Sequence, residues 1–160
     1  MIYLDTCYIL KCYLTEHGSK EVRELTQKAD GLASCYLARI EFAAAVHRHQ
    51  REGKLSDEDT NAVFDSFEAD EKAGYWRWYG VTQALCDKVF SSYRSLPPSL
   101  FVRTNDAVHL VCAREQGFRE IYSNDRHILA AAQSFSLDAI DVIRSWQSVR
   151  PVCDDGDETG

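Results

Sequence analysis

The 160-residue sequence has no apolar run near the roughly 20 residues that are needed to span a bilayer. Its first residues, MIYLDTCYIL, place Asp5 inside the apolar run and have no basic segment before it. A signal peptide would need that basic segment and an uninterrupted apolar stretch. These absences exclude a membrane-spanning protein and predict a cytoplasmic location.

The sequence also lacks the cysteine pattern of a metal-binding or disulfide-linked scaffold. None of the six cysteines forms a CxxC pair, and the cysteines and five histidines do not have zinc-finger spacing. Without a secretory signal, we expect reduced and mostly buried thiols rather than disulfides.

A basic surface is missing as well. The chain has 18 Lys and Arg against 25 Asp and Glu, a formal net charge of −7. This balance argues against nucleic-acid binding through a generally basic surface. It leaves open a local basic rim around an acidic, metal-loaded cleft, and it leaves room for a basic protein partner.

No internal repeat and no boundary to a second domain is visible. The length and the 45% hydrophobic content fit one globular domain, which we place at residues 1–148. Residues 149–160 are acidic and contain glycine, so they predict a disordered tail.

Strand-like and helix-like segments alternate along the chain, which predicts an α/β/α sandwich with a short, mainly parallel sheet flanked by helices. Two of the helices, joined by a short loop at Gly53, should form a hairpin outside the sheet. We expect strands at 2–4, 32–35, 75–81, 120–123 and 137–142, and helices at 19–29, 36–51, 82–94, 106–116 and 126–134, with another beginning after Ser56.

Two acids follow predicted strands at their carboxyl ends, where open α/β sheets bind ligands. These are Asp5, after an apolar run at the amino terminus, and Asp125, after the short strand-like segment 120–123. Taken alone, Asp5 has a simpler interpretation, because Asp or Thr at this position also caps a following helix. The sequence around Asp5 favours this second interpretation when it is considered by itself.

Two further acids lie on helices that should pack against the sheet. Asp106 opens a long apolar helix, and Glu41 lies at the edge of an apolar stripe in the helix 36–51. A carboxylate there is costly unless it is paired or binds a metal, although a glutamate at the rim of a buried face is equally acceptable. We expect that stripe to consist of Leu37, Ile40, Ala44 and His47.

Four carboxylates that converge on one cleft would repel each other unless cations neutralise them. Oxygen-rich sites of this kind favour hard ions, so we expect Mg²⁺ or Mn²⁺ rather than zinc. A metal site of this composition suits the hydrolysis of phosphodiester bonds. The set of acids is stronger evidence than any one of them.

These residues resemble the PIN-domain nucleases, and among them the VapC-like toxins of bacterial toxin–antitoxin pairs. The resemblance covers nearly the whole chain, most specifically in MIYLDT, RTNDAVHLVCA and YSNDRHILAAA, and more loosely in CYLARIEF. It implies an Mg²⁺- or Mn²⁺-dependent endoribonuclease, a homodimer, and a small antitoxin protein bound on the helical hairpin. The family's acidic quartet falls on Asp5, Glu41, Asp106 and Asp125.

The resemblance also suggests supporting residues. Thr6 and Ser123 would hold the acids or a water molecule. Independently of the resemblance, basic residues near the acids would meet the RNA backbone, and Arg103 and Arg126 are the best candidates, ahead of Arg39 and Arg48. For each arginine, an ion pair with a nearby acid is an equally good interpretation. His109 fits a buried, hydrogen-bonded histidine better than a general base.

Cys7 and Cys35 stand where many family members carry small polar residues. We expect both thiols near the cleft, where their oxidation would slow the enzyme.

Two other functions compete with a ribonuclease. A PIN-like scaffold could bind RNA or protein without cutting, although an inert scaffold would have no need for all four acids. A phosphatase of the haloacid dehalogenase type would need a second aspartate two residues after Asp5, and Cys7 stands there.

Overall fold

Short strands and longer helices alternate in the computed structural model, which describes residues 1–143. The predicted tail at 149–160 lies outside the described residues. In chain order the elements are β1 (Ile2–Tyr3), α1 (Thr6–Tyr13), α2 (Ser19–Gln27), β2 (Leu32–Cys35), α3 (Leu37–Arg51), α4 (Asp57–Lys72), β3 (Trp76–Tyr79), α5 (Gln83–Tyr93), α6 (Thr104–Glu115), β4 (Glu120–Tyr122), α7 (Arg126–Ala131), the 3₁₀-helix η1 (Ala132–Phe135) and β5 (Asp138–Ile140).

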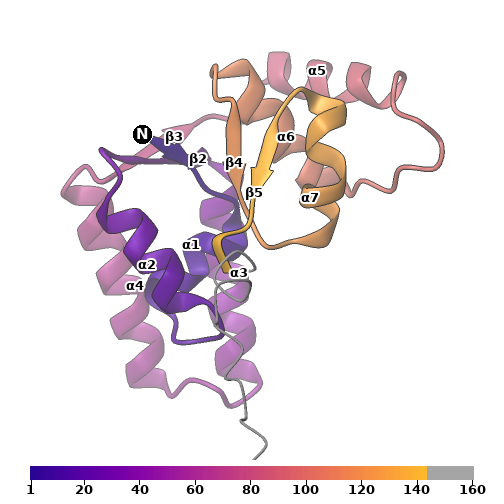
Figure 1. The fold of residues 1–160 in the computed structure, drawn as a ribbon. Helices are drawn as coiled ribbons and strands as arrows, with labels where there is room; N and C mark the ends of the chain where they lie inside the picture. Colours follow the sequence, from indigo (N-terminus) through magenta and orange to yellow (C-terminus); the bar gives the residue numbers. More distant parts are fainter. Residues whose placement is uncertain (144–160) are drawn as a thin grey trace, which may run out of the picture.

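All strand pairs are parallel. β2 lies between β1 and β3, and β4 pairs with β5. A bridge between Leu4 and Tyr122, with a hydrogen bond of 3.0 Å from the Asp5 amide to the Tyr122 carbonyl, joins the two groups. The strand order is therefore β3-β2-β1-β4-β5 (Figure 1). The chain reverses its direction across the sheet between β1 and β4, and parallel sheets bind ligands at such a point.

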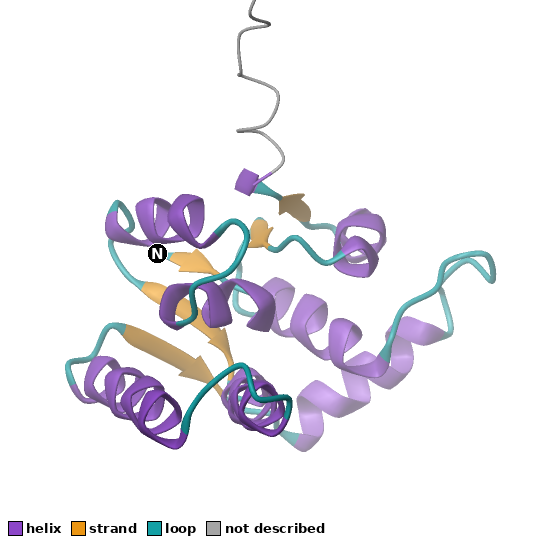
Figure 2. Ribbon diagram, turned by 90° about the horizontal axis from the view of Figure 1, so that it is seen from below, coloured by secondary structure: helices purple, strands orange, loops and turns teal. Residues whose placement is uncertain are grey.

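Helices cover both faces of the sheet (Figure 2). One buried cluster combines residues of α1 to α4, such as Tyr8, Val22 and Phe42, with Leu4 after β1. The other combines residues of α5 to η1, such as Leu85, Leu110 and Ile128, with strand residues. This arrangement confirms the predicted α/β/α sandwich with a short parallel sheet.

The expected apolar stripe of α3 was wrong. The buried side chains are Ala38, Phe42, Ala45 and Val46, whereas Ile40, Ala44 and His47 are exposed. Phe42 determines the rotation of the helix because its ring stacks on Phe67 of α4, with centroids 4.3 Å apart. The small alanines fit either orientation and gave no signal of their own. As a result, Glu41 turns toward the carboxyl end of the sheet.

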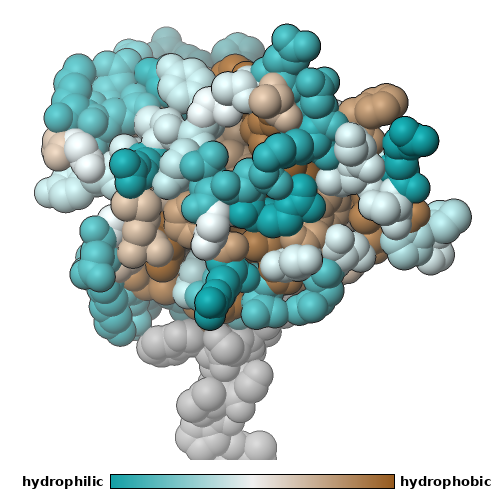
Figure 3. All heavy atoms as spheres, turned by 90° about the horizontal axis from the view of Figure 1, so that it is seen from above, coloured by the Kyte–Doolittle hydropathy of each residue, from teal (hydrophilic) through white to brown (hydrophobic). Residues whose placement is uncertain are grey.

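The surface mixes hydrophilic side chains with apolar patches, as the view from above shows (Figure 3). No helix in the described part of the chain is long and apolar enough to cross a membrane. The five cysteines within residues 1–143 are free thiols, as predicted, but only Cys35 and Cys112 are buried.

Candidate metal and active site

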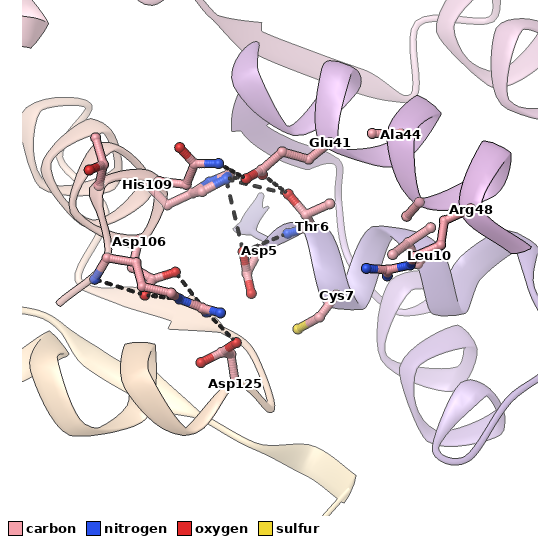
Figure 4. A pocket seen from close by; sticks show the side chains of 14 residues that line it. Asp5, Thr6, Cys7, Leu10, Glu41, Ala44, Arg48, Asp106, His109 and Asp125 are labelled. Carbon is pink, nitrogen blue, oxygen red and sulfur yellow. Dashed lines mark hydrogen bonds and ion pairs between the residues drawn. The ribbon is translucent and has the colours of Figure 1, made fainter. Parts of the chain in front are cut away.

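A cleft of about 450 Å³ opens at the carboxyl ends of β1 and β4. All four predicted acids line it: Asp5 after β1, Glu41 on α3, Asp106 on α6 and Asp125 after β4 (Figure 4). The other lining residues are Thr6, Cys7, Leu10, Ala44, Ala45, Arg48, Arg103, Thr104, Asn105 and His109.

Asp5 is held by short side chains and backbone. Its Oδ1 accepts a hydrogen bond of 2.7 Å from the Thr6 amide, and its Oδ2 accepts one of 2.9 Å from the Ser123 hydroxyl. The same hydroxyl accepts a hydrogen bond of 2.9 Å from the Asp125 amide. Ser123 therefore links the acids that follow β1 and β4, and its contact with Asp5 agrees with the supporting role expected for it.

Three side chains hold Glu41. The Thr6 hydroxyl donates to its Oε2 at 2.5 Å, His109 Nε2 lies 2.9 Å from the same oxygen, and Asn105 Nδ2 donates to Oε1 at 2.6 Å. Burial opposes ionisation of Glu41, but these hydrogen bonds outweigh it and lower its pKa. Asn105 was not predicted from the sequence, because an asparagine in the first turn of a helix carries no distinctive signal.

His109 is buried, and only 1% of its surface is exposed. Burial by itself would lower its pKa, but the hydrogen bond to Glu41 and the charges of Asp5 and Glu41 raise it to about 9. A metal ion on the same acids would reduce this shift, because it would neutralise their charge. The position agrees with the buried, hydrogen-bonded histidine that the sequence indicated.

Arg103 binds the other two acids. Its guanidinium contacts both oxygens of Asp106, at 2.9 and 3.0 Å, and reaches Asp125 Oδ2 at 2.6 Å. Burial raises the pKa of Asp125, but the His127 amide and Arg103 outweigh it, so the pKa is lowered. The Arg103 side chain remains 48% exposed, so it has solvent-filled space into which it can turn.

Three of the acids also stabilise helix starts. Asp5 caps α1, Asp125 caps α7 through the His127 amide at 2.7 Å, and Asp106 accepts from the Arg103 amide at the start of α6. The helix dipoles therefore favour their negative charge. The cap interpretation of Asp5 is correct, and it does not conflict with a metal site, because Asp5 also lines the cleft.

The donor set fits a hard divalent cation, because its four acids offer only oxygen ligands. Within residues 1–143, however, no three acidic, histidine or cysteine side chains already stand close enough together to hold one ion. Arg103 binds both oxygens of Asp106 and Oδ2 of Asp125. Joint use of these acids by a metal requires this guanidinium to move.

The remaining predicted residues differ in their positions. Arg48 lines the cleft, whereas Arg126 does not, and its Nε lies 3.3 Å from His127 Nε2. Arg39 is paired with Glu71 at 3.0 Å. The expectation for the two cysteines is met in part: Cys7 lines the cleft, and Cys35 is buried in the core.

The chain belongs to the PIN domain family, whose pattern it matches over residues 2–134. This result confirms the resemblance drawn from the acid-containing motifs. No curated protein gives a significant match to the sequence.

Two solved structures share the fold. VapC20 of Mycobacterium tuberculosis, described as a sarcin–ricin loop cleaving toxin, superposes with a TM-score of 0.64 at 15% identity, over 82% of this chain and 95% of that chain. VapBC2 from Rickettsia felis, solved with a DNA fragment from its promoter, gives a TM-score of 0.61 at 15% identity, over 88% and 98%. The similarity at this identity is one of fold.

Proposed function

We propose that the protein is a metal-dependent endoribonuclease and the toxin of a toxin–antitoxin pair. The observation that carries this proposal is the convergence of Asp5, Glu41, Asp106 and Asp125 on one cleft, in a chain of the PIN domain family. The fold shared with two VapC proteins, one of them described as a cleaving toxin, supports the assignment. We place the activity in the cytoplasm.

The acids would hold Mg²⁺ or Mn²⁺. Such an ion supplies an activated water for attack on phosphorus and offsets negative charge on the phosphoryl oxygens. The chain's own residues prepare the acids for this role. Thr6, Ser123 and His109 fix the oxygens of Asp5 and Glu41, and the lowered pKa of Glu41 keeps it ionised at neutral pH.

Two protein partners belong to the proposal. A small antitoxin would bind the hairpin of α3 and α4, where a hollow of about 170 Å³ lies over Phe42, Phe64 and Phe67. A second copy of the chain would form a homodimer. Exposed aromatic side chains on α5 and the following loop, Phe90 and Phe101, supply apolar surface for one of these contacts.

The alternative is a PIN-like scaffold that binds RNA or protein without cutting. An inert scaffold has no need for four acids that converge on one cleft, and this convergence favours the enzyme.

The decisive experiment incubates the purified protein and Asp106→Asn with total RNA, in Mn²⁺ or in EDTA. We expect cuts only with the parent protein and Mn²⁺, because the amide is nearly isosteric with the acid but offers no full charge to a metal. Sequencing the cut ends would identify the target. Cleavage by Asp106→Asn, or by the parent in EDTA, would refute the proposed mechanism.

A further inference from the structure

One face of α3 extends the cleft away from the acids. Glu41, Ala44, Ala45 and Arg48 all line the cleft, at the spacing of three, four and seven residues that places side chains along one side of a helix. Seven residues correspond to about 10 Å along the helix axis. Arg48 therefore stands well beyond the acid that α3 contributes.

Arg48 differs from the other basic residues of the cleft because it forms no ion pair with a carboxylate among the described residues. Arg103 binds Asp106 and Asp125, and His109 binds Glu41. Among residues 1–143, no carboxylate lies within ion-pair distance of Arg48. Its guanidinium points toward the middle of the cleft, near Leu10 (Figure 4).

The surface between the acids and Arg48 is made of small or apolar side chains. Leu10 contributes from α1, and Ala44 and Ala45 contribute from α3. Such a surface leaves room for an RNA strand to lie along the helix, and its side chains carry no hydrogen-bonding groups that the strand would have to pair. Asp5 and Asp106 are nearly buried at the other end, so a flexible single strand can reach them more easily than a rigid duplex.

We infer that Arg48 binds a phosphate of a single-stranded RNA on one side of the bond that is cut, with the strand passing over Ala44. This inference rests on the proposed function and adds a substrate subsite to it. A polyanion that enters an acidic cleft needs a cation beyond the acids to hold it, and phosphate contacts of this kind set the register of the strand. Arg48 is the cation in place to do so.

The test measures binding rather than cleavage. A fluorescein-labelled, single-stranded RNA of mixed sequence is titrated with the protein in EDTA at several salt concentrations, and anisotropy gives the affinity. Arg48→Met should weaken binding about tenfold at low salt, because a hydrogen-bonded ion pair is lost. It should also reduce the slope of log affinity against log salt by about 0.7, the value for one phosphate contact on a single strand.

Arg51→Met is the matched control. Arg51 lies on the same helix and is exposed, but it does not line the cleft. Its substitution by Met removes the same charge. The slope of log affinity against log salt for Arg51→Met should equal that of the parent protein. A second variant, Ala44→Leu, adds bulk to an exposed position of α3 and should block the strand while circular dichroism stays unchanged.

Three results would overturn the inference: an unchanged slope in Arg48→Met, an equal loss in Arg51→Met, or tight binding by Ala44→Leu. Cleavage in Mn²⁺ separates this failure from failure of the proposed function. A parent protein that cuts RNA while Arg48→Met binds normally refutes only the subsite. A parent protein that binds RNA with the predicted Arg48 dependence but never cuts refutes only the nuclease.

Discussion

The two sides of the cleft hold their acids in different ways. On the histidine side, Glu41 is held by His109, whose side chain is 2% exposed, and Asp5 is held by Thr6 and Ser123. On the arginine side, Asp106 and Asp125 share Arg103, which is 48% exposed. One partner is a buried imidazole, and the other is a half-exposed guanidinium on a long, flexible side chain.

We therefore expect the histidine side of the cleft to be rigid and the arginine side to exchange its guanidinium for a metal ion. A buried imidazole cannot leave Glu41 without repacking the core, so the histidine side keeps its geometry. Arg103 can turn into solvent and release both acids to a metal ion. The arginine side is therefore the part of the site that we expect to change when a cation binds.

The largest effect should come from Asp5→Asn on the histidine side, because Asp5 also binds Ser123, which accepts from the Asp125 amide. Loss of one metal-binding charge should reduce RNA cleavage about 1,000-fold or more, with little change in folding. The measurement is the initial rate of cleavage, in Mn²⁺, of an RNA that the parent protein cuts. Asp57→Asn, the same chemical change on the surface of α4, should keep full activity, and equal losses would point to a general charge effect.

His109→Leu should show the rigidity of the histidine side. It leaves Glu41 without its cation in a partly buried site, and breaking such a pair costs about 3 kcal/mol of unfolding free energy. Arg103→Met should cost less, about 1 kcal/mol, because Asp106 is buried but the guanidinium is 48% exposed and water can take its place. Urea denaturation in EDTA measures both. Equal losses would remove the distinction between the two sides.

The sequence pointed to the four acids because each stands where a local pattern draws attention to it, and the structure places all four on one cleft. Asp5 and Asp125 follow short strands, and Asp106 lies in the first turn of an apolar helix. Glu41 was found although the predicted buried face of α3 was wrong. Small and apolar residues lie on more than one side of this helix, so Glu41 borders an apolar face in either orientation. Only the stacking of Phe42 on Phe67, a contact between two helices, determines which side is buried.

The partners of the acids were beyond the reach of local patterns. The contact of Arg103 with Asp125 spans 22 positions, and that of Asn105 with Glu41 spans 64. Both depend on how α6 lies against β4 and α3. Arg48 was likewise ranked below Arg103 from the sequence, because ion pairing of each arginine is decided by tertiary structure.

Arg103→Met should also reveal the exchange on the arginine side. Without the guanidinium, Asp106 and Asp125 are free to bind a metal, so we expect Mn²⁺ to bind about tenfold more tightly, a change of about 1.4 kcal/mol. Isothermal titration calorimetry measures this affinity directly. Arg126→Met is the control, because Arg126 does not line the cleft. Unchanged or weaker binding in Arg103→Met would show that the arginine does not compete with the metal.

The smallest effect should come from Thr6→Val, which keeps the shape of the side chain and removes only the hydroxyl that Glu41 accepts from at 2.5 Å. We expect a loss of about 1 kcal/mol in unfolding free energy in EDTA, because His109 and Asn105 still hold the carboxylate. Thr26→Val is the control, since that hydroxyl donates to the Arg23 carbonyl within α2. If both variants lose the same amount, Thr6 acts only as an ordinary helix residue, and the histidine side depends on His109 and Asn105 alone.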